Sequence, residues 1–176
     1  DILDFSFADA DNGIAIVGDR GDISRSSPGY FASPLNAPVE LTHDGGEHWQ
    51  EVSPFGPADP PPFSRVQAIA ALDSSHFLMI LNHPQVEDAF VITSDGGRTW
   101  KVIHQRDDET NRDSAKQVFV HDGEYWAFGT QLLNRQSRGG YTAGMTRHSK
   151  DGETWLAGTS SDRDSGVCNQ EGCYLW

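Results

Sequence analysis

The 176-residue sequence contains little cysteine, few basic residues and no long apolar run. Lysine and arginine total 13 against 26 aspartates and glutamates, which gives a formal net charge of −13. This charge excludes a nucleic acid as the main partner, because a phosphate backbone binds to basic surfaces. No apolar run is longer than that of Phe77–Leu81, whereas a membrane-spanning helix needs about 20 apolar residues. The composition therefore predicts a protein that neither inserts into a membrane nor binds nucleic acid.

Cysteine occurs at two positions, Cys168 and Cys173, which enclose a four-residue segment with a glycine at its end. A loop of this size suits a hairpin whose strands hold two Cα atoms at disulfide distance. The alternative is a metal pair, but a zinc site needs further cysteines or histidines at short spacing, and this segment has none. The spacing favours a disulfide and, with it, an exported location that is extracellular or periplasmic. We expect no metal and no cofactor.

Three segments of the chain repeat one another. Each has a Ser or Thr, an Asp two positions later, at least one Gly directly after the Asp, and a Trp at the end. They are Thr42–Trp49, Thr93–Trp100 and Ser149–Trp155, and the third is one residue shorter than the others. Their Asp residues lie 51 and 56 positions apart, a period typical of repeat architectures.

Each repeated segment has the composition of a tight turn. An Asp carboxylate accepts hydrogen bonds from backbone N–H groups of a turn, and glycine adopts the positive φ angles that turns require. The Trp that follows can bury a large ring beneath the turn. We therefore predict structural roles, without chemistry, for one Asp–Trp pair in each repeat: Asp44 with Trp49, Asp95 with Trp100, and Asp151 with Trp155.

Strand-like sequence flanks each repeated segment. Alternating or continuous apolar stretches, separated by short turns such as Asp11-Asn12-Gly13 and Asp122-Gly123, supply four predicted strands per repeat. Four antiparallel strands are the content of one propeller blade. The sequence thus predicts an all-β fold, a β-propeller or part of one. The predicted blades span residues 1–53, 64–104 and 114–158, and residues 159–176 begin a further strand or hairpin.

The three segments resemble Asp boxes, also called BNR repeats, of the sialidase-like β-propeller superfamily. The double glycine at Gly45-Gly46 and Gly96-Gly97, and the stretch Asp4–Gly18, are most similar to photosystem II assembly and stability factors. This resemblance implies a non-catalytic scaffold that binds a protein or glycan partner. The alternative that it implies is a glycoside hydrolase of the sialidase or xyloglucanase type. The Phe/Tyr-Arg-Ile-Pro signature expected of sialidases is absent, which favours the scaffold.

Three blades cannot close a ring, because propellers usually have four to eight. We weigh two explanations: the chain is part of a longer polypeptide with a ring of six or seven blades, or several copies assemble into one ring. An open arrangement would expose strand edges.

The resemblance also implies a ligand site on the face opposite the repeated turns, built from the long loops between strands. Loops on a rigid scaffold often carry function. The predicted binding residues are Arg20, Asp22, Arg25, Tyr30, Asp88, Arg112, Arg135 and Arg138. No catalytic residue is predicted.

Overall fold

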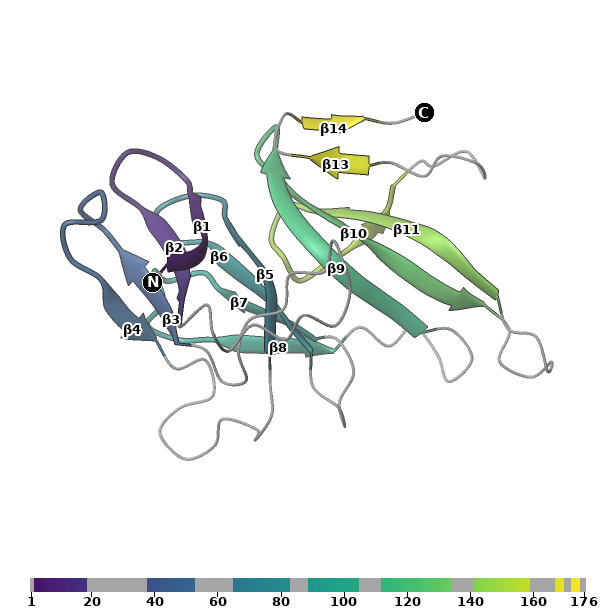
Figure 1. Ribbon diagram of the computed structural model, residues 1–176, viewed down its shortest axis with the longest axis horizontal. Helices are drawn as coiled ribbons and strands as arrows, with labels where there is room; N and C mark the ends of the chain where they lie inside the picture. Colours follow the sequence, from purple (N-terminus) through teal and green to yellow (C-terminus); the bar gives the residue numbers. More distant parts are fainter. Residues whose placement is uncertain are drawn as a thin grey trace.

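The computed structural model describes eight stretches of the chain. They are residues 2–18, 38–52, 65–82, 89–104, 112–133, 141–158, 167–169 and 172–174. Every regular element within these stretches is a β-strand (Figure 1), which confirms the predicted all-β class. The described residues include no helix long and apolar enough to cross a membrane.

Three antiparallel sheets of four strands follow one another along the chain, and in each sheet the strands are adjacent in chain order. The first sheet contains β1 (Ile2–Phe7), β2 (Gly13–Val17), β3 (Val39–Thr42) and β4 (Gln50–Val52). The second contains β5 (Arg65–Ala71), β6 (Phe77–Asn82), β7 (Ala89–Thr93) and β8 (Lys101–His104). The third contains β9 (Arg112–His121), β10 (Glu124–Leu133), β11 (Tyr141–Ser149) and β12 (Leu156–Ala157).

The second sheet lies between the other two (Figure 1) and is buried on both faces. Successive side chains of a strand point to opposite faces. Along β6, Phe77 and Met79 therefore pack toward the first sheet, while Leu78 and Ile80 pack toward the third. This explains why Phe77–Leu81 of β6 and Ala89–Ile92 of β7 are continuous apolar runs rather than alternating ones: every residue of β7 is buried.

Two separate apolar cores join the sheets. The core between the first and second sheets contains Ile14, Ile16 and Leu41 of the first sheet against Phe77 and Met79 of the second. The core between the second and third sheets joins Leu78, Ile80, Phe90 and Ile92 of the second to Ala115, Tyr125 and Met145 of the third. The first strand of each sheet contacts the first strand of the next, so β1, β5 and β9 are neighbours along the side of the stack where the sheets begin.

Large apolar side chains are exposed on all three sheets: Ile2, Phe5 and Phe7 on the first, Val102 on the second and Leu156 on the third. Phe5 is 63% exposed on the first sheet, and Leu156 is 58% exposed on the third. The two expectations for completing a ring, further blades of a longer chain or further copies, both stay predictions.

A two-stranded hairpin follows the third sheet, with β13 (Val167–Asn169) paired to β14 (Gly172–Tyr174). The register places Cys168 opposite Cys173 in the backbone ladder. The side chains of this hairpin lie outside the described residues, and the disulfide stays a prediction.

Candidate functional site

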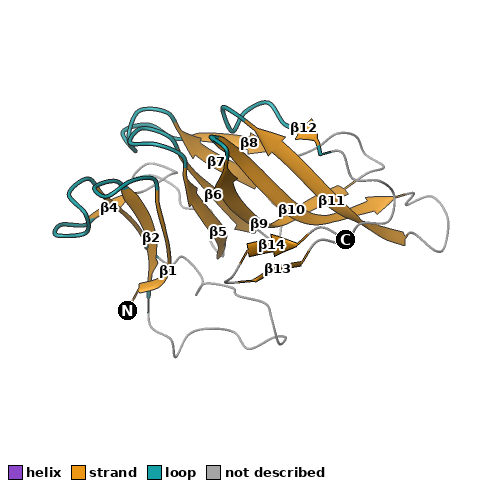
Figure 2. Ribbon diagram, turned by 90° about the horizontal axis from the view of Figure 1, so that it is seen from above, coloured by secondary structure: helices purple, strands orange, loops and turns teal. Residues whose placement is uncertain are grey.

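The tight turns of the three sheets lie along one edge of the stack, which we call the turn face (Figure 2). Because the strands are antiparallel, the turn from the first to the second strand and the turn from the third to the fourth lie at the same end of a sheet. In the first two sheets, a backbone bond ties these two turns together. Gly45 N donates to Asp11 O, and Gly96 N donates to Ser75 O, each at 2.9 Å.

The repeated Asp turns of the first and second sheets have the same internal hydrogen bonds. In the second sheet, the Thr93 hydroxyl donates to Asp95 Oδ1 at 2.8 Å and accepts from Gly97 N at 3.0 Å. Asp95 Oδ1 also accepts from Thr99 N at 2.9 Å. The first sheet repeats these bonds with Thr42, Asp44 and Gly46. The carboxylate thus closes the turn in the way that the sequence predicts.

The second carboxylate oxygen of these Asp residues also has a partner. Thr99 Oγ1 donates to Asp95 Oδ2 at 2.6 Å, and His48 Nδ1 lies 2.7 Å from Asp44 Oδ2. The hydrogen bonds of Thr99 hold the pKa of Asp95 at about 2, and those of His48 do the same for Asp44. Both carboxylates are therefore ionised at neutral pH.

Asp44, Glu47 and His48 bring three potential metal-ligand atoms within 4.8 Å of one another. His48 makes the contact to Asp44 that Thr99 makes to Asp95 at the equivalent position. All three side chains are exposed. The geometry is explained by turn formation, and we assign no metal site to it.

Two glycines of the Asp turns allow each turn to approach the preceding sheet closely. Gly97 has φ +87°, and a Cβ at this position would lie 2.3 Å from Leu41 Cδ1. Gly152 has φ +74°, and its Cβ would lie 3.0 Å from Ile92 Cγ2. Side chains are therefore disfavoured here both by backbone conformation and by the neighbouring sheet.

The Trp of the second and third Asp turns packs, like the glycine of the turn, against the preceding sheet. Trp100 packs against the core between the first and second sheets, and Trp155 packs against the core between the second and third. Trp155 also stacks on Phe90 with ring centroids 4.3 Å apart. Trp49 makes an edge contact with Phe7 of its own sheet. The Asp and Trp residues of the three turns make contacts within their own turn or between neighbouring sheets. That their role is exclusively structural stays a prediction.

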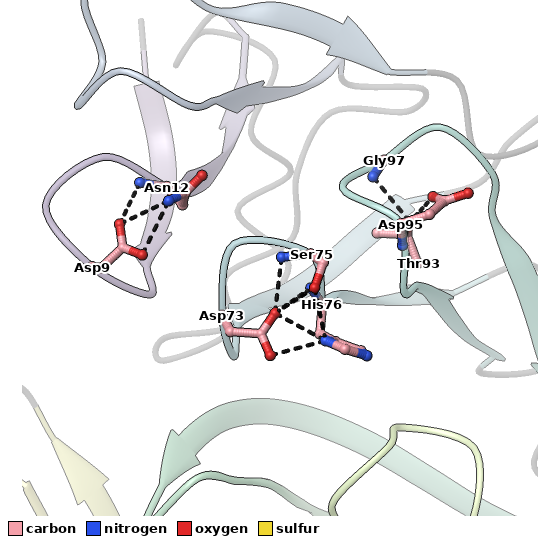
Figure 3. A network of polar contacts seen from close by, with 8 residues as sticks. All are labelled: Asp9, Asn12, Asp73, Ser75, His76, Thr93, Asp95 and Gly97. Carbon is pink, nitrogen blue, oxygen red and sulfur yellow. Dashed lines mark hydrogen bonds and ion pairs between the residues drawn. The ribbon is translucent and has the colours of Figure 1, made fainter.

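The shorter turns on this face use further aspartates (Figure 3). Asp73 Oδ1 accepts hydrogen bonds from Ser75 N at 2.8 Å and His76 N at 2.9 Å. Partial burial acts to raise the pKa of Asp73, but the bonds from Ser75 and His76 outweigh it and hold this pKa at about 2. Asp9 has the same place in the first sheet and accepts from Asp11 N and Asn12 N.

A polar groove of about 460 Å³ opens on the turn face between the first and second sheets. It is lined by Asn12, His43, Gln50, Ser74, Ser75, Asp95, Gly96 and Arg98. One of its walls is fixed by a chain of hydrogen bonds: Asn12 Nδ2 donates to Asp9, so Asn12 Oδ1 accepts from His43 Nδ1 at 2.7 Å. The sequence analysis predicted a site in the long loops and not this groove, because the groove residues lie on or beside turns that the sequence marks as structural.

A second polar cluster lies on the third sheet. His148 Nδ1 is 2.7 Å from Glu124 Oε2, and the His148 ring stacks on Trp126 with centroids 4.9 Å apart. The hydrogen bond from His148 lowers the pKa of Glu124. Within the described chain, the buried indole Nε1 of Trp126 has no hydrogen-bond partner. Residues 24 positions apart form this hydrogen-bonded pair, and no local motif marks it in the sequence.

Most of the predicted binding residues fall outside the part of the chain that the structure describes. These are Arg20, Asp22, Arg25, Tyr30, Asp88, Arg135 and Arg138. Arg112 begins β9, but its side chain is not among those described. The predicted loop site is therefore untested and stays a prediction.

Comparison with known proteins yields a structural match. No family model and no curated protein matches the chain. A solved structure described as YCF48 bound to D1 peptide matches 89% of the chain, with a TM-score of 0.51 and 20% sequence identity. The fold is that of a β-propeller. The three sheets are consistent with propeller blades, and the expected fold class is confirmed. The chain spans 38% of the length of that similar chain.

Proposed function

We propose that this chain is a non-catalytic propeller segment that binds a protein partner through the loops opposite the turn face. The observation that supports this most is the structural similarity, over 89% of the chain, to a propeller solved with a bound peptide. The chemistry of the turn face agrees with it. The carboxylates of Asp44, Asp73 and Asp95 are occupied by hydrogen bonds within their own turns.

The proposal includes the assignment of the three repeated turns as Asp boxes. Its support is the recurrence of one hydrogen-bond pattern at Asp44 and Asp95 and of a related, shorter one at Asp151. In the third turn, Asp151 Oδ1 accepts from Thr154 N at 2.8 Å, and Gly152 N donates to Ser149 Oγ at 2.8 Å. In this assignment the boxes hold the ends of the strands together, and the loops at the other end are left to bind.

Affinity capture with three forms of the chain tests which end binds the partner. The forms are the unaltered chain, a loop variant in which Arg20, Arg25, Arg135 and Arg138 are replaced by Ala, and a turn-face variant, Lys101→Ala. A partner that is retained by the unaltered chain and by Lys101→Ala, but lost by the loop variant, supports the proposal. Equal capture by all three forms would contradict it. Circular dichroism of each form verifies that the sheets are intact.

The same preparation distinguishes the other classes of function. Turnover of fluorogenic sialosides or β-glucan oligosaccharides would show that the chain is a glycoside hydrolase and not a non-catalytic scaffold. Binding to a glycan array, with no protein captured, would assign a glycan as the partner.

We also propose that Cys168 and Cys173 form a disulfide and that the protein works in an exported, extracellular or periplasmic compartment. The opposed backbone positions of the two cysteines in the β13–β14 hairpin support this. Thiol titration of the denatured, unreduced protein should detect no free thiol, and reduction should release two. Two thiols before reduction would refute the disulfide and remove the support for the location.

A further inference from the structure

The two seams between neighbouring sheets are equivalent position by position. Gly97 sits against Leu41, whose ladder partner is Gln50, and Gly152 sits against Ile92, whose ladder partner is Lys101. The residues that follow these glycines are Arg98 and Glu153. Arg98 with Gln50 at the first seam therefore corresponds to Glu153 with Lys101 at the second.

The second seam is closed by a charge pair across this position. Lys101 Nζ lies 2.5 Å from Glu153 Oε2. At the first seam the cation is on the turn, as Arg98, and the strand position carries the neutral amide of Gln50. A groove of about 460 Å³ opens at this seam, and both Arg98 and Gln50 line it.

The groove has polar groups that are already used and others that are not. Asn12 and His43 bond to each other, and Ser75 Oγ donates to Asp73 Oδ1 at 2.9 Å. By contrast, no hydrogen bond or ion pair within the described residues involves the side chains of Arg98, Gln50 or Ser74. These three present a guanidinium, a primary amide and a hydroxyl to the groove.

We propose that this groove binds an acidic side chain of an extended peptide segment, with the ligand carboxylate on Arg98 and the adjoining peptide groups on Gln50 and Ser74. The planar guanidinium matches a carboxylate in a two-pronged hydrogen-bonding geometry. The amide and hydroxyl offer both donors and acceptors, as a peptide backbone requires. This site lies on the turn face and goes beyond the proposed loop-end function.

The surrounding charges select a single carboxylate over a more highly charged group. Asp73 and Asp95, which are ionised at neutral pH, lie at or next to the groove. A phosphate dianion would be repelled by both aspartates more strongly than a carboxylate monoanion is. A single carboxylate paired with Arg98 leaves only the negative charge of the two aspartates in this region, whereas a dianion would add a further negative charge.

Nuclear magnetic resonance titration of the full chain tests this site with a defined probe. The probe is the blocked peptide acetyl-Gly-Ser-Glu-Ser-Gly-amide, and its matched control has Gln in place of Glu. We expect saturable shifts of the Arg98 Nε–H and the Gln50 side-chain amide with the Glu peptide, and at least tenfold weaker binding of the Gln peptide. Absence of saturable shifts at millimolar peptide, or equal shifts with both peptides, would overturn the proposal.

Two variants and one control separate the groove from a general surface effect. Arg98→Gln removes the anchor, and Gln50→Glu supplies an internal carboxylate that reproduces the charge pair of the second seam. Each should weaken the Glu peptide at least tenfold. Glu153→Gln at the second seam should leave the affinity unchanged. If Gln50→Glu bound the Glu peptide with unchanged affinity, binding in the groove would be refuted, even if Arg98→Gln were poorly folded.

Discussion

The first and second seams of the sheet stack have the same kind of apolar packing, but the polar contacts at their edges differ. In both, an Asp turn places a glycine and a Trp of one sheet onto the preceding sheet. The second seam is then closed by Lys101 and Glu153, whereas the first keeps an open groove beside Arg98 and Gln50. The comparison shows that the repeated positions determine how the sheets pack. The variable positions between them differ, with a charge pair at the second seam and an open groove at the first.

Truncation of the seam tryptophans should have the largest effect. Trp155→Ala removes the stack on Phe90 and the hydrogen bond from Nε1 to Gly152 O, and should lower the free energy of unfolding by about 3 kcal/mol. Trp49→Ala, outside either seam, should lower it by only about 1 kcal/mol. Urea denaturation measures both. Equal losses would show that the seams do not depend on the tryptophans.

A side chain at Gly97 should also weaken the first seam. Gly97→Ala introduces a Cβ at positive φ against the buried Leu41, and should cost about 2–3 kcal/mol in unfolding free energy. Gly123→Ala is the matched control, because Gly123 has φ +73° with no atom within 4 Å of the added Cβ. It should cost about 1 kcal/mol through backbone conformation alone. A cost for Gly97→Ala no greater than the control would refute close contact at the seam.

Acid should destabilise the turns of both seams, and more so the turn at the first. Bonds from Thr99 lower the pKa of Asp95 from 3.8 to about 2, and the bond from Thr154 N lowers that of Asp151. A lowered pKa in the folded state stabilises the fold above pH 4, and this stabilisation is lost as the pH falls from about 4 toward 2. Melting temperatures measured across this range should fall less steeply for Asp95→Asn than for the unaltered chain. Asp151→Asn should change the slope less, and an unchanged slope in Asp95→Asn would contradict the assignment.

The charge pair at the second seam should make the smallest contribution. Lys101 and Glu153 are 59% and 44% exposed, so Glu153→Gln should cost about 0.5 kcal/mol or less in unfolding free energy. Gln50→Glu should gain a similar amount at the first seam, and more at low salt than at high salt. Denaturation at two salt concentrations measures both changes. A gain that does not depend on salt would exclude a new pair with Arg98.

The sequence predicts the all-β class and the propeller fold because these depend on features that repeat locally. The Asp, Gly and Trp of each turn, and the apolar strands around them, can be read within a few residues of one another. The groove depends instead on Gln50 and Arg98, which lie on different sheets and become neighbours only through the packing of Gly97 on Leu41. The hydrogen-bonded pair of Glu124 and His148 likewise depends on strand register.

Two interpretations of the sequence around His48 compete, a metal site and a turn. His48 beside Asp44 and Glu47 has the composition of a metal site. Its true equivalent is Thr99, which bonds to Asp95 in the second sheet, so His48 serves the turn. Alignment of the repeats, which is available from sequence, shows that these two residues share a position. Their shared contact is visible only in the structure.

Native-state hydrogen exchange of Trp155→Ala tests the coupling of the sheets most directly. If the seams join the sheets into one cooperative unit, slow-exchanging amides of β6 and β7 in the second sheet should lose protection by the same factor as those of β10 and β11 in the third. Loss of protection confined to β10 and β11 would show that the sheets open independently, and would contradict the role assigned to the seams.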